Sequence, residues 1–267
     1  MSVTDAILTF DNVSKRFGGL AVVEDLSFSV RRGTCTGLIG PNGAGKTTVF
    51  NLITGVYPID AGCIMLGGVD IARIPSRRRI HHGVARNFQN IRLMPHLSAL
   101  ENVLVGQHCR NSGFFGMLQP VNLVPGNRWR QEARAALDEA GLGAYERATV
   151  GSLPYGLQKR IELVRALMAK PQLLLLDEPA AGLNPAETDA LRERITAICG
   201  EQGITLLVVE HDMHFVGALC AQVIVLNFGR KIAEGTPDQL KTSVATADRP
   251  EPTLEETFIS LIEREAA

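Results

Sequence analysis

Apolar and polar positions alternate along the first part of the chain, as they do in half-buried strands. The alternation covers residues 7–13 and 26–30, and the short apolar segment 34–39 is typical of a central strand. Residues 40–45 are too rich in glycine for regular structure, and a helical pattern then runs from Lys46 to a C-terminal cap at Gly55. The predicted local order is therefore strand, glycine-rich loop, helix.

The pattern of apolar and polar residues changes between about residues 91 and 151, where helical patterns are interrupted by predicted loops. One of these loops is the Gly, Pro and Asn-rich stretch 111–127. Residues 129–140 have the apolar stripe of an amphipathic helix, and residues 158–170 have core spacing up to Pro171, which ends the helix. We expect a helical insertion between two parts of a sheet.

The last third of the chain alternates strands and helices, which favours a parallel sheet. The apolar run 173–176 predicts a strand buried on both faces. The units that follow are 186–199 (helix), 205–209 (strand), 213–220 (helix) and 223–228 (strand). The polar, Pro-containing segment 242–252 is interpreted as a linker, and the apolar stripe Leu254, Phe258, Leu261 and Ile262 predicts a terminal helix that packs on its own domain.

Composition narrows the class of protein. Of 267 residues, 45% are hydrophobic, which is enough to build a core, and no apolar run approaches the ~20 residues that span a bilayer. With 27 Lys and Arg against 28 Asp and Glu, the chain has no global attraction for nucleic acid. No secretory signal is visible in the first residues, and the five scattered cysteines include no C-x-x-C pair. We therefore expect free thiols in a reducing cytosol.

The strongest chemical signal is the sequence from Gly40 to Thr47, which satisfies the spacing G-x-x-x-x-G-K-[ST]. Its glycines let backbone N–H groups converge on phosphate oxygens at the positive end of the following helix. Lys46 would reach the β- and γ-phosphates, and the Thr47 hydroxyl would bind Mg²⁺. We expect a phosphate-binding loop here, because the predicted strand and helix flank the motif.

Acidic and histidine side chains follow two of the predicted strands. Asp177 and Glu178 come directly after 173–176, at the sheet edge where α/β folds bind ligands. Adjacent side chains on an extended segment point to opposite sides, so one acid can hold Mg²⁺ while the other faces a water in line with the γ-phosphate. His211 follows the strand 205–209 and would arrive at the same edge, if the strands are neighbours.

These residues together resemble the ATP-binding-cassette ATPases over nearly the whole chain. The loop and the acid pair resemble the Walker A and Walker B motifs, Gln89 lies where the Q-loop should be, and His211 matches the switch histidine. The resemblance implies a P-loop α/β fold with a mostly parallel sheet, an antiparallel N-terminal β-subdomain and an inserted α-helical subdomain. It implies an ATPase domain at residues 1–242, with the helical subdomain at roughly 91–160, and a linker and C-terminal helix at 243–267.

The resemblance also implies roles for single residues. Glu178, His211 and Gln89 would be catalytic, and Thr47, Gln89 and Asp177 would hold Mg²⁺. Phe17 is similar to the aromatic residue that stacks on adenine. The residues implied to contact ATP are Phe17, Gly40, Asn42, Gly43, Ala44, Gly45, Lys46, Thr47, Thr48, Tyr155 and Gly156.

Residues 153–160, here called the signature segment, fill the place of the family's L-S-G-G-Q motif. Because this segment belongs to the helical insertion, the resemblance implies that it meets the ATP of a second subunit in a head-to-tail dimer. The sequence departs from the common form: Pro154 replaces Ser, Leu157 replaces Gln and Asn184 replaces the usual D-loop Asp. The Pro-Tyr-Gly form and the segments 88–93 and 177–185 resemble one subgroup, the ATP-binding subunits of branched-chain amino-acid importers.

This subgroup implies that the chain powers amino-acid uptake by ATP hydrolysis. The implied partners are a second ATP-binding subunit, identical or related, membrane permease subunits and, indirectly, an extracytoplasmic binding protein, but no nucleic acid. The implied location is the cytoplasmic face of a bacterial inner membrane, as a peripheral subunit. Alternatives are the same role in urea uptake or lipopolysaccharide export, a non-transport cassette protein, and a P-loop GTPase or kinase, against which the absence of an N-K-x-D motif argues.

Overall fold

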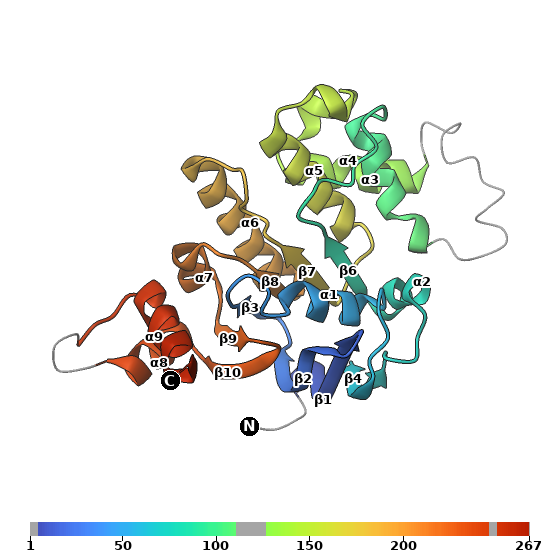
Figure 1. The fold of residues 1–267 in the computed structure, drawn as a ribbon. Coiled ribbons are helices and arrows are strands. Elements are labelled where there is room, and N and C mark those ends of the chain that lie inside the picture. Colours follow the sequence, from blue (N-terminus) through green and yellow to red (C-terminus); the bar gives the residue numbers. More distant parts are fainter. Residues whose placement is uncertain (1–4, 111–126, 246–249, 267) are drawn as a thin grey trace.

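The computed structural model describes residues 5–110, 127–245 and 250–266. Among these residues, four strands near the N-terminus form an antiparallel sheet in the order β2-β1-β4-β5 (Figure 1). Their bounds are β1 (Ala6–Phe17), β2 (Leu20–Arg31), β4 (Ala61–Leu66) and β5 (Val69–Asp70). Phe10 of β1 and Phe28 of β2 are register partners whose rings stack at 4.5 Å between centroids. Such a cross-strand aromatic pair stabilises the sheet.

The second sheet of the described chain has six strands in the order β10-β9-β3-β8-β7-β6. The bounds are β3 (Cys35–Ile39), β6 (Val84–Asn87), β7 (Leu173–Asp177), β8 (Thr205–Val209), β9 (Gln222–Asn227) and β10 (Arg230–Gly235). All neighbouring pairs are parallel except β9 and β10. The ends of β3, β6, β7 and β8 therefore meet at one edge of the sheet, as the predicted parallel architecture requires.

Two hydrophobic cores cover the two faces of this sheet. Along β7, Leu173 and Leu175 belong to the core that it shares with the antiparallel sheet and α1 (Lys46–Thr54), whereas Leu174 and Leu176 belong to the core beneath α6 (Pro185–Gln202). This alternation is the period of two that a strand imposes, with both faces apolar. Helix α7 (Met213–Leu219) contributes to the second core through Phe215.

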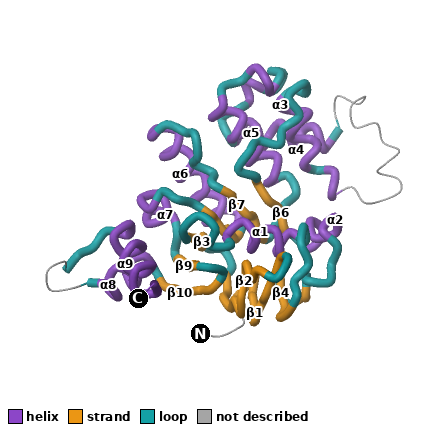
Figure 2. Tube along the Cα trace, viewed as in Figure 1, coloured by secondary structure: helices purple, strands orange, loops and turns teal. Residues whose placement is uncertain are grey.

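A third core belongs to the helical insertion, where α3 (Ala99–Gly106), α4 (Arg128–Glu139) and α5 (Tyr155–Leu167) pack together (Figure 2). Ala133 and Leu137 of the predicted amphipathic helix are fully buried there. Most of the predicted loop 111–127 lies outside the described residues. Helix α5 begins at Tyr155, three residues before the predicted start, so part of the signature segment forms its first turn.

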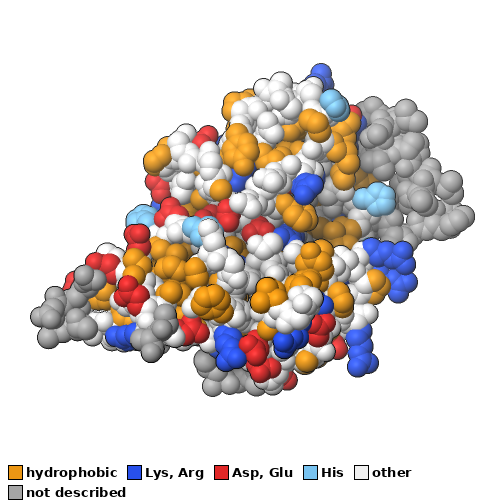
Figure 3. All heavy atoms as spheres, viewed as in Figure 1, with side chains coloured by type: hydrophobic (Ala, Val, Ile, Leu, Met, Phe, Trp, Pro, Cys, Tyr) orange, Lys and Arg blue, Asp and Glu red, His pale blue; other side chains and the backbone are white. Residues whose placement is uncertain are grey.

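The remaining short elements connect these layers. They are α2 (Ser76–Arg79) and the 3₁₀ turns Ile80–His82, His108–Arg110, Gly143–Tyr145 and Val150–Ser152. Lys, Arg, Asp and Glu side chains are interspersed over the face shown in Figure 3. In the described part of the chain, no helix is long and apolar enough to cross a membrane.

The described C-terminal residues contain one more helix than the sequence predicts. Helix α8 (Pro237–Val244) occupies the start of the predicted linker, because Thr236 caps its N-terminus and Gln239 completes a capping box. The linker prediction is therefore wrong at residues 242–244. Helix α9 (Leu254–Ala266) packs against α7, α8 and β10, with Leu254 buried, which confirms that the terminal stripe packs on its own domain.

Candidate active site

The glycine-rich loop joins β3 to α1 and has the backbone that anion binding requires. Gly43 and Gly45 have φ values of 83° and 99°, and a Cβ atom at Gly45 would lie 2.8 Å from the Val22 carbonyl oxygen. Gly45 is the N-cap of α1, no side chain caps the helix, and its first turn holds no acidic residue. The N–H groups of this turn are therefore available to an anion, which the helix dipole also favours.

Lys46 lies in the first turn of α1 and folds back over the loop. Its Nζ donates to the carbonyl oxygens of Gly40 at 2.6 Å and Pro41 at 3.0 Å. Burial lowers the pKa of Lys46, whereas the carboxylates of Glu178 and Asp177 raise it. The ammonium is thus held against the loop, beside two negative charges, where it can turn to a phosphate.

The sheet edge brings the three predicted catalytic residues into contact. Gln89 Nε2 donates to Glu178 Oε2 at 2.6 Å, and His211 Nε2 lies 3.1 Å from Glu178 Oε1. These residues follow β6, β7 and β8, which are adjacent strands. We call this group, together with Asp177, the sheet-edge site. Their contact agrees with the predicted grouping, and their individual roles remain predictions.

Asp177 is held in a way that the sequence did not reveal. Arg86 Nη2 lies 2.6 Å from Asp177 Oδ2, with both side chains less than 10% exposed, and Arg86 Nη1 donates to Asn51 Oδ1 at 2.7 Å. The guanidinium also lies over the rings of Phe50 and Phe88. A charged residue within the strand β6 was the available signal, since such a residue needs a buried partner.

The donor set fits a hard cation such as Mg²⁺. Thr47 is exposed at the first turn of α1, and Asp177 Oδ2 accepts from Arg86 while no described residue donates to its Oδ1. Hydroxyl and carboxylate oxygens are the ligands that Mg²⁺ takes, completed by water and phosphate. Among the described residues, no cluster of three or more His, Cys, Asp or Glu side chains could hold a metal by itself.

Glu210 and Lys159 bind backbone atoms next to the sheet-edge site, and the sequence analysis did not predict either of them as part of the site. Glu210 is buried, and its carboxylate accepts from the backbone N–H of Ala180 at 2.7 Å and of His211 at 3.0 Å. Burial raises the pKa of Glu210, and the negative charge of Glu178 adds to the effect. Lys159 Nζ donates to the carbonyl oxygens of Glu178 and Pro179. Both are buried charged residues whose partners are backbone atoms. Because every residue has these atoms, the spacing of residue types in the sequence does not predict such contacts.

Phe17 ends β1 and is a partly exposed ring, 37% accessible, rather than a core residue. Tyr57, which follows α1, packs edge-on against it at 4.9 Å between ring centroids, and Lys15 Nζ lies 5.2 Å from the Phe17 centroid. A ring fixed in this way can stack on a planar base. Tyr57 was not predicted as part of this platform.

The N-terminus of α5 lies apart from the phosphate loop. Helix α5 packs against α3, α4 and β6, whereas α1 packs against β2. Tyr155 lies against Gly182, and a Cβ atom at Gly156 would lie 2.4 Å from Glu187 Oε1. The structure therefore groups Tyr155 and Gly156 with the segment after β7, and not with Lys46.

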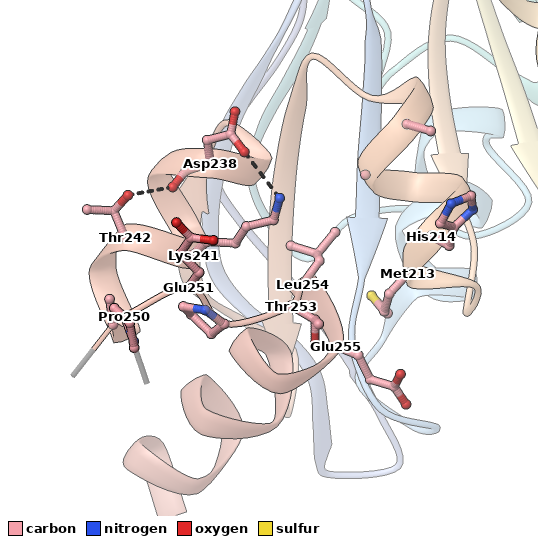
Figure 4. A pocket seen from close by; sticks show the side chains of 14 residues that line it. Met213, His214, Asp238, Lys241, Thr242, Pro250, Glu251, Thr253, Leu254 and Glu255 are labelled. Atoms are coloured by element: carbon pink, nitrogen blue, oxygen red, sulfur yellow. Dashed lines mark hydrogen bonds and ion pairs between the residues drawn. The ribbon is translucent and has the colours of Figure 1, made fainter. Parts of the chain in front are cut away.

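A hollow of about 830 Å³ lies among α7, α8 and the start of α9 (Figure 4). Met213 and His214 line it on one side, and Asp238 and Lys241, which form an ion pair, on the other. None of its lining residues belongs to the predicted site. The hollow is therefore not assigned to the nucleotide.

Comparison with known proteins places these features in a family. A family model described as ABC transporter matches residues 23–181. The high-affinity branched-chain amino acid transport ATP-binding protein BraF of Pseudomonas aeruginosa is 41% identical over 238 residues, covering 88% of this chain and 93% of BraF. The corresponding LivG of Escherichia coli is 37% identical over 247 residues, covering 90% and 96%.

Solved structures agree with the sequence relatives. A nucleotide-free ATP-binding cassette from an ABC transporter has a TM-score of 0.79 and 29% identity, covering 91% of this chain and 97% of its own. The ADP conformation of another such cassette has a TM-score of 0.80 and 28% identity, covering 98% and 99%.

Proposed function

Because this chain belongs to the ABC transporter family, we propose that it is the ATP-hydrolysing subunit that energises an importer of branched-chain amino acids. The observation that carries the catalytic part of the proposal is the contact of Glu178 with both Gln89 and His211, at the edge of the sheet that also bears the phosphate loop. The similarity to BraF and LivG over about nine tenths of the chain supports the cargo.

Glu178 is the proposed general base. It accepts a proton from the water that attacks the γ-phosphate, and His211 and Gln89 orient that water and the phosphate. In the structure each Glu178 oxygen already has a partner, so the water gains its acceptor when Gln89 turns toward the phosphates. Lys46 likewise exchanges the carbonyls of Gly40 and Pro41 for phosphate oxygens.

Thr47, Asp177 and Gln89 would hold Mg²⁺, and the ion would supply positive charge for the phosphate oxygens. Phe17 stacks on adenine. The phosphate contacts come from the loop and the first turn of α1, namely Gly40, Asn42, Gly43, Ala44, Gly45, Lys46, Thr47 and Thr48. Tyr155 and Gly156 contact the ATP of a second subunit, since they lie apart from this chain's own loop.

The proposed assembly contains a second ATP-binding subunit, identical or related, and membrane permease subunits that receive an amino acid from an extracytoplasmic binding protein. The chain works as a peripheral subunit at the cytoplasmic face of a bacterial inner membrane. Residues 1–242 form the ATPase domain, with the helical subdomain at about 91–160. Residues 243–267 form the C-terminal extension.

The catalytic assignment is tested by Glu178→Gln, which keeps the size of the side chain and one acceptor oxygen but replaces the other oxygen with an NH₂ group and removes the base. We expect kcat for ATP hydrolysis to fall by roughly 10²–10⁴-fold, the usual worth of a positioned base, while Mg-ATP binding persists. Glu201→Gln, on the exposed side of α6, is the matched control and should behave as the parent chain. Hydrolysis at the parent rate in Glu178→Gln would contradict the assignment.

The cargo is tested in a bacterial strain that lacks its own branched-chain ATP-binding subunit but retains the permease pair and the binding protein. Expression of this chain should restore uptake of labelled leucine, and Glu178→Gln should not, because binding without hydrolysis cannot drive the cycle. ATP hydrolysis by the purified complex should rise with the leucine-loaded binding protein. If ATP hydrolysis rose instead with urea and its binding protein, the proposed cargo would be wrong, whereas the proposed ATPase role would stand.

A further inference from the structure

Lys159 is a buried cation whose partners are backbone atoms. The residue is 5% exposed, and Nζ donates to the carbonyl oxygens of Glu178 at 3.0 Å and Pro179 at 3.1 Å. Within the described residues, the ammonium forms no ion pair closer than 4 Å. Burial lowers the pKa of Lys159. A buried charge is costly unless it is paired or hydrogen-bonded. The two carbonyls stabilise the ammonium, and the nearby carboxylates of Glu210, Glu162 and Glu178 raise its pKa against the effect of burial.

One of the two carbonyls belongs to the proposed base itself, and the backbone there is strained. Glu178 has a φ of 47°, in the left-handed region that residues other than glycine rarely adopt. Such a conformation costs on the order of 1–3 kcal/mol and persists only where the surroundings hold it. Glu178 N donates to Val209 O at 2.8 Å, and Glu210 holds the N–H of Ala180 two residues later. On the other side of this residue, Lys159 binds the carbonyl oxygen of Glu178.

Lys159 also lies close to Tyr155 and Gly156, the residues proposed to contact the ATP of a second subunit. Lys159 lies one turn after Tyr155 and Gly156 on the same helix, and its Nζ is 5.5 Å from the centroid of the Tyr155 ring. Tyr155 in turn lies against Gly182, in the segment that follows Glu178. Residues four apart are neighbours on one helix face, and a helix can transmit a displacement as a rigid element, so Lys159 would follow a shift of the α5 N-terminus.

We propose that Lys159 is a positioning residue that links the N-terminus of α5 to the backbone of Glu178. A nucleotide bound against Tyr155 and Gly156 fixes α5, and Lys159 then fixes the carbonyl, and through it the carboxylate, of Glu178 at this chain's own phosphate loop. The two ATP sites of the dimer are thereby connected within each subunit. This inference rests on the proposed function, because it needs ATP at both places.

The test compares Lys159→Met, which keeps the length of the side chain without its charge, with Lys159→Arg, which restores donors. The matched control is Lys241→Met on α8, where the lysine forms its ion pair with Asp238. Full-length chains are measured with Mg-ATP for kcat and KM, with kcat expressed per folded molecule from a thermal unfolding curve. A misplacement of about 1 Å can cost up to ~10²-fold in rate, so we expect Lys159→Met to lower kcat by about tenfold or more.

KM for ATP should stay close to the parent value in Lys159→Met, because Lys159 does not touch the phosphate loop. Lys159→Arg should recover part of kcat, and Lys241→Met should change neither quantity. A role in folding alone would lower the unfolding temperature while leaving kcat per folded molecule within about twofold of the control, and that result would overturn the proposal. If Lys159→Met does not fold, Lys159→Gln, which retains one donor group, is judged by the same two quantities.

The same series contains the parent chain and Glu178→Gln, which separates the two proposals. A parent chain that binds ATP without hydrolysing it, or a Glu178→Gln chain as active as the parent, overturns the proposed function. An active parent and an inactive Glu178→Gln, together with an unaffected Lys159→Met, overturn the link through Lys159 alone.

Discussion

The sheet-edge site and the N-terminus of α5 are both proposed to contact ATP, but they are built differently. At the sheet edge, Gln89, Glu178 and His211 come from three adjacent strands and contact one another. At α5, the N-cap Pro154 makes no side-chain cap, and Tyr155 is 43% exposed. Parallel strands arrange the first group within one chain. The second group lies at a helix N-terminus that no side chain caps, so its backbone N–H groups remain available to an anion.

The largest predicted effect concerns the buried ion pair beneath the sheet edge. Arg86→Met leaves the Asp177 carboxylate buried without its cation, and breaking a buried pair in this way typically costs about 3–5 kcal/mol. We therefore expect a loss of about this size in the free energy of unfolding, measured by urea denaturation. The double variant Arg86→Met with Asp177→Asn should recover part of the loss, because the uncompensated charge is removed.

The control for this prediction lies on the helical side. Arg194 of α6 pairs with Glu139 of α4 at 2.8 Å, but the two side chains are 26% and 54% exposed. Exposed pairs contribute about 0–1 kcal/mol, so Arg194→Met should change stability little. Equal losses in the free energy of unfolding from Arg86→Met and Arg194→Met would contradict the proposed difference between a buried ion pair at the sheet edge and an exposed ion pair near α5.

An intermediate effect is expected at the adenine platform. Phe17→Ala should weaken ATP binding by about 1–3 kcal/mol, the usual worth of one base stacked on one aromatic ring. Inorganic triphosphate has no base, so its binding to the loop should be unchanged, and Phe17→Trp should keep ATP affinity. Equal weakening of ATP and triphosphate binding would mean that Phe17 supports the loop rather than the base.

The sequence predicted the elements whose signals are local and missed contacts whose partners are distant. The strand β7 and the helix α1 follow from an apolar run and from a glycine cap, and Glu178 and His211 follow from motif order. The strand β6 has no such pattern, because Arg86 interrupts it to meet Asp177, 91 positions away. Lys159 binds backbone carbonyls, which every residue has, so spacing cannot identify its acceptors.

The smallest predicted effect concerns Leu157, in the first turn of α5. Leu157 stands where the family motif has Gln, and its side chain packs against the core of the helical subdomain. Leu157→Gln removes part of that packing but offers an amide to the nucleotide of a second subunit. One added hydrogen bond is worth about 0.5–1.5 kcal/mol, so ATP hydrolysis should rise by roughly two- to tenfold under conditions where two subunits associate.

That rise should depend on the concentration of the protein, since the amide acts only across a dimer. ATP affinity of the dilute chain, which reports its own phosphate loop, should be unchanged, and the unfolding temperature should fall slightly because Leu157 loses packing. Leu157→Met, similar in volume but without the amide, is the matched control and should leave hydrolysis unchanged. A rise in hydrolysis that is independent of protein concentration would contradict the assignment of α5 to the partner's ATP, because the amide would then act within its own chain.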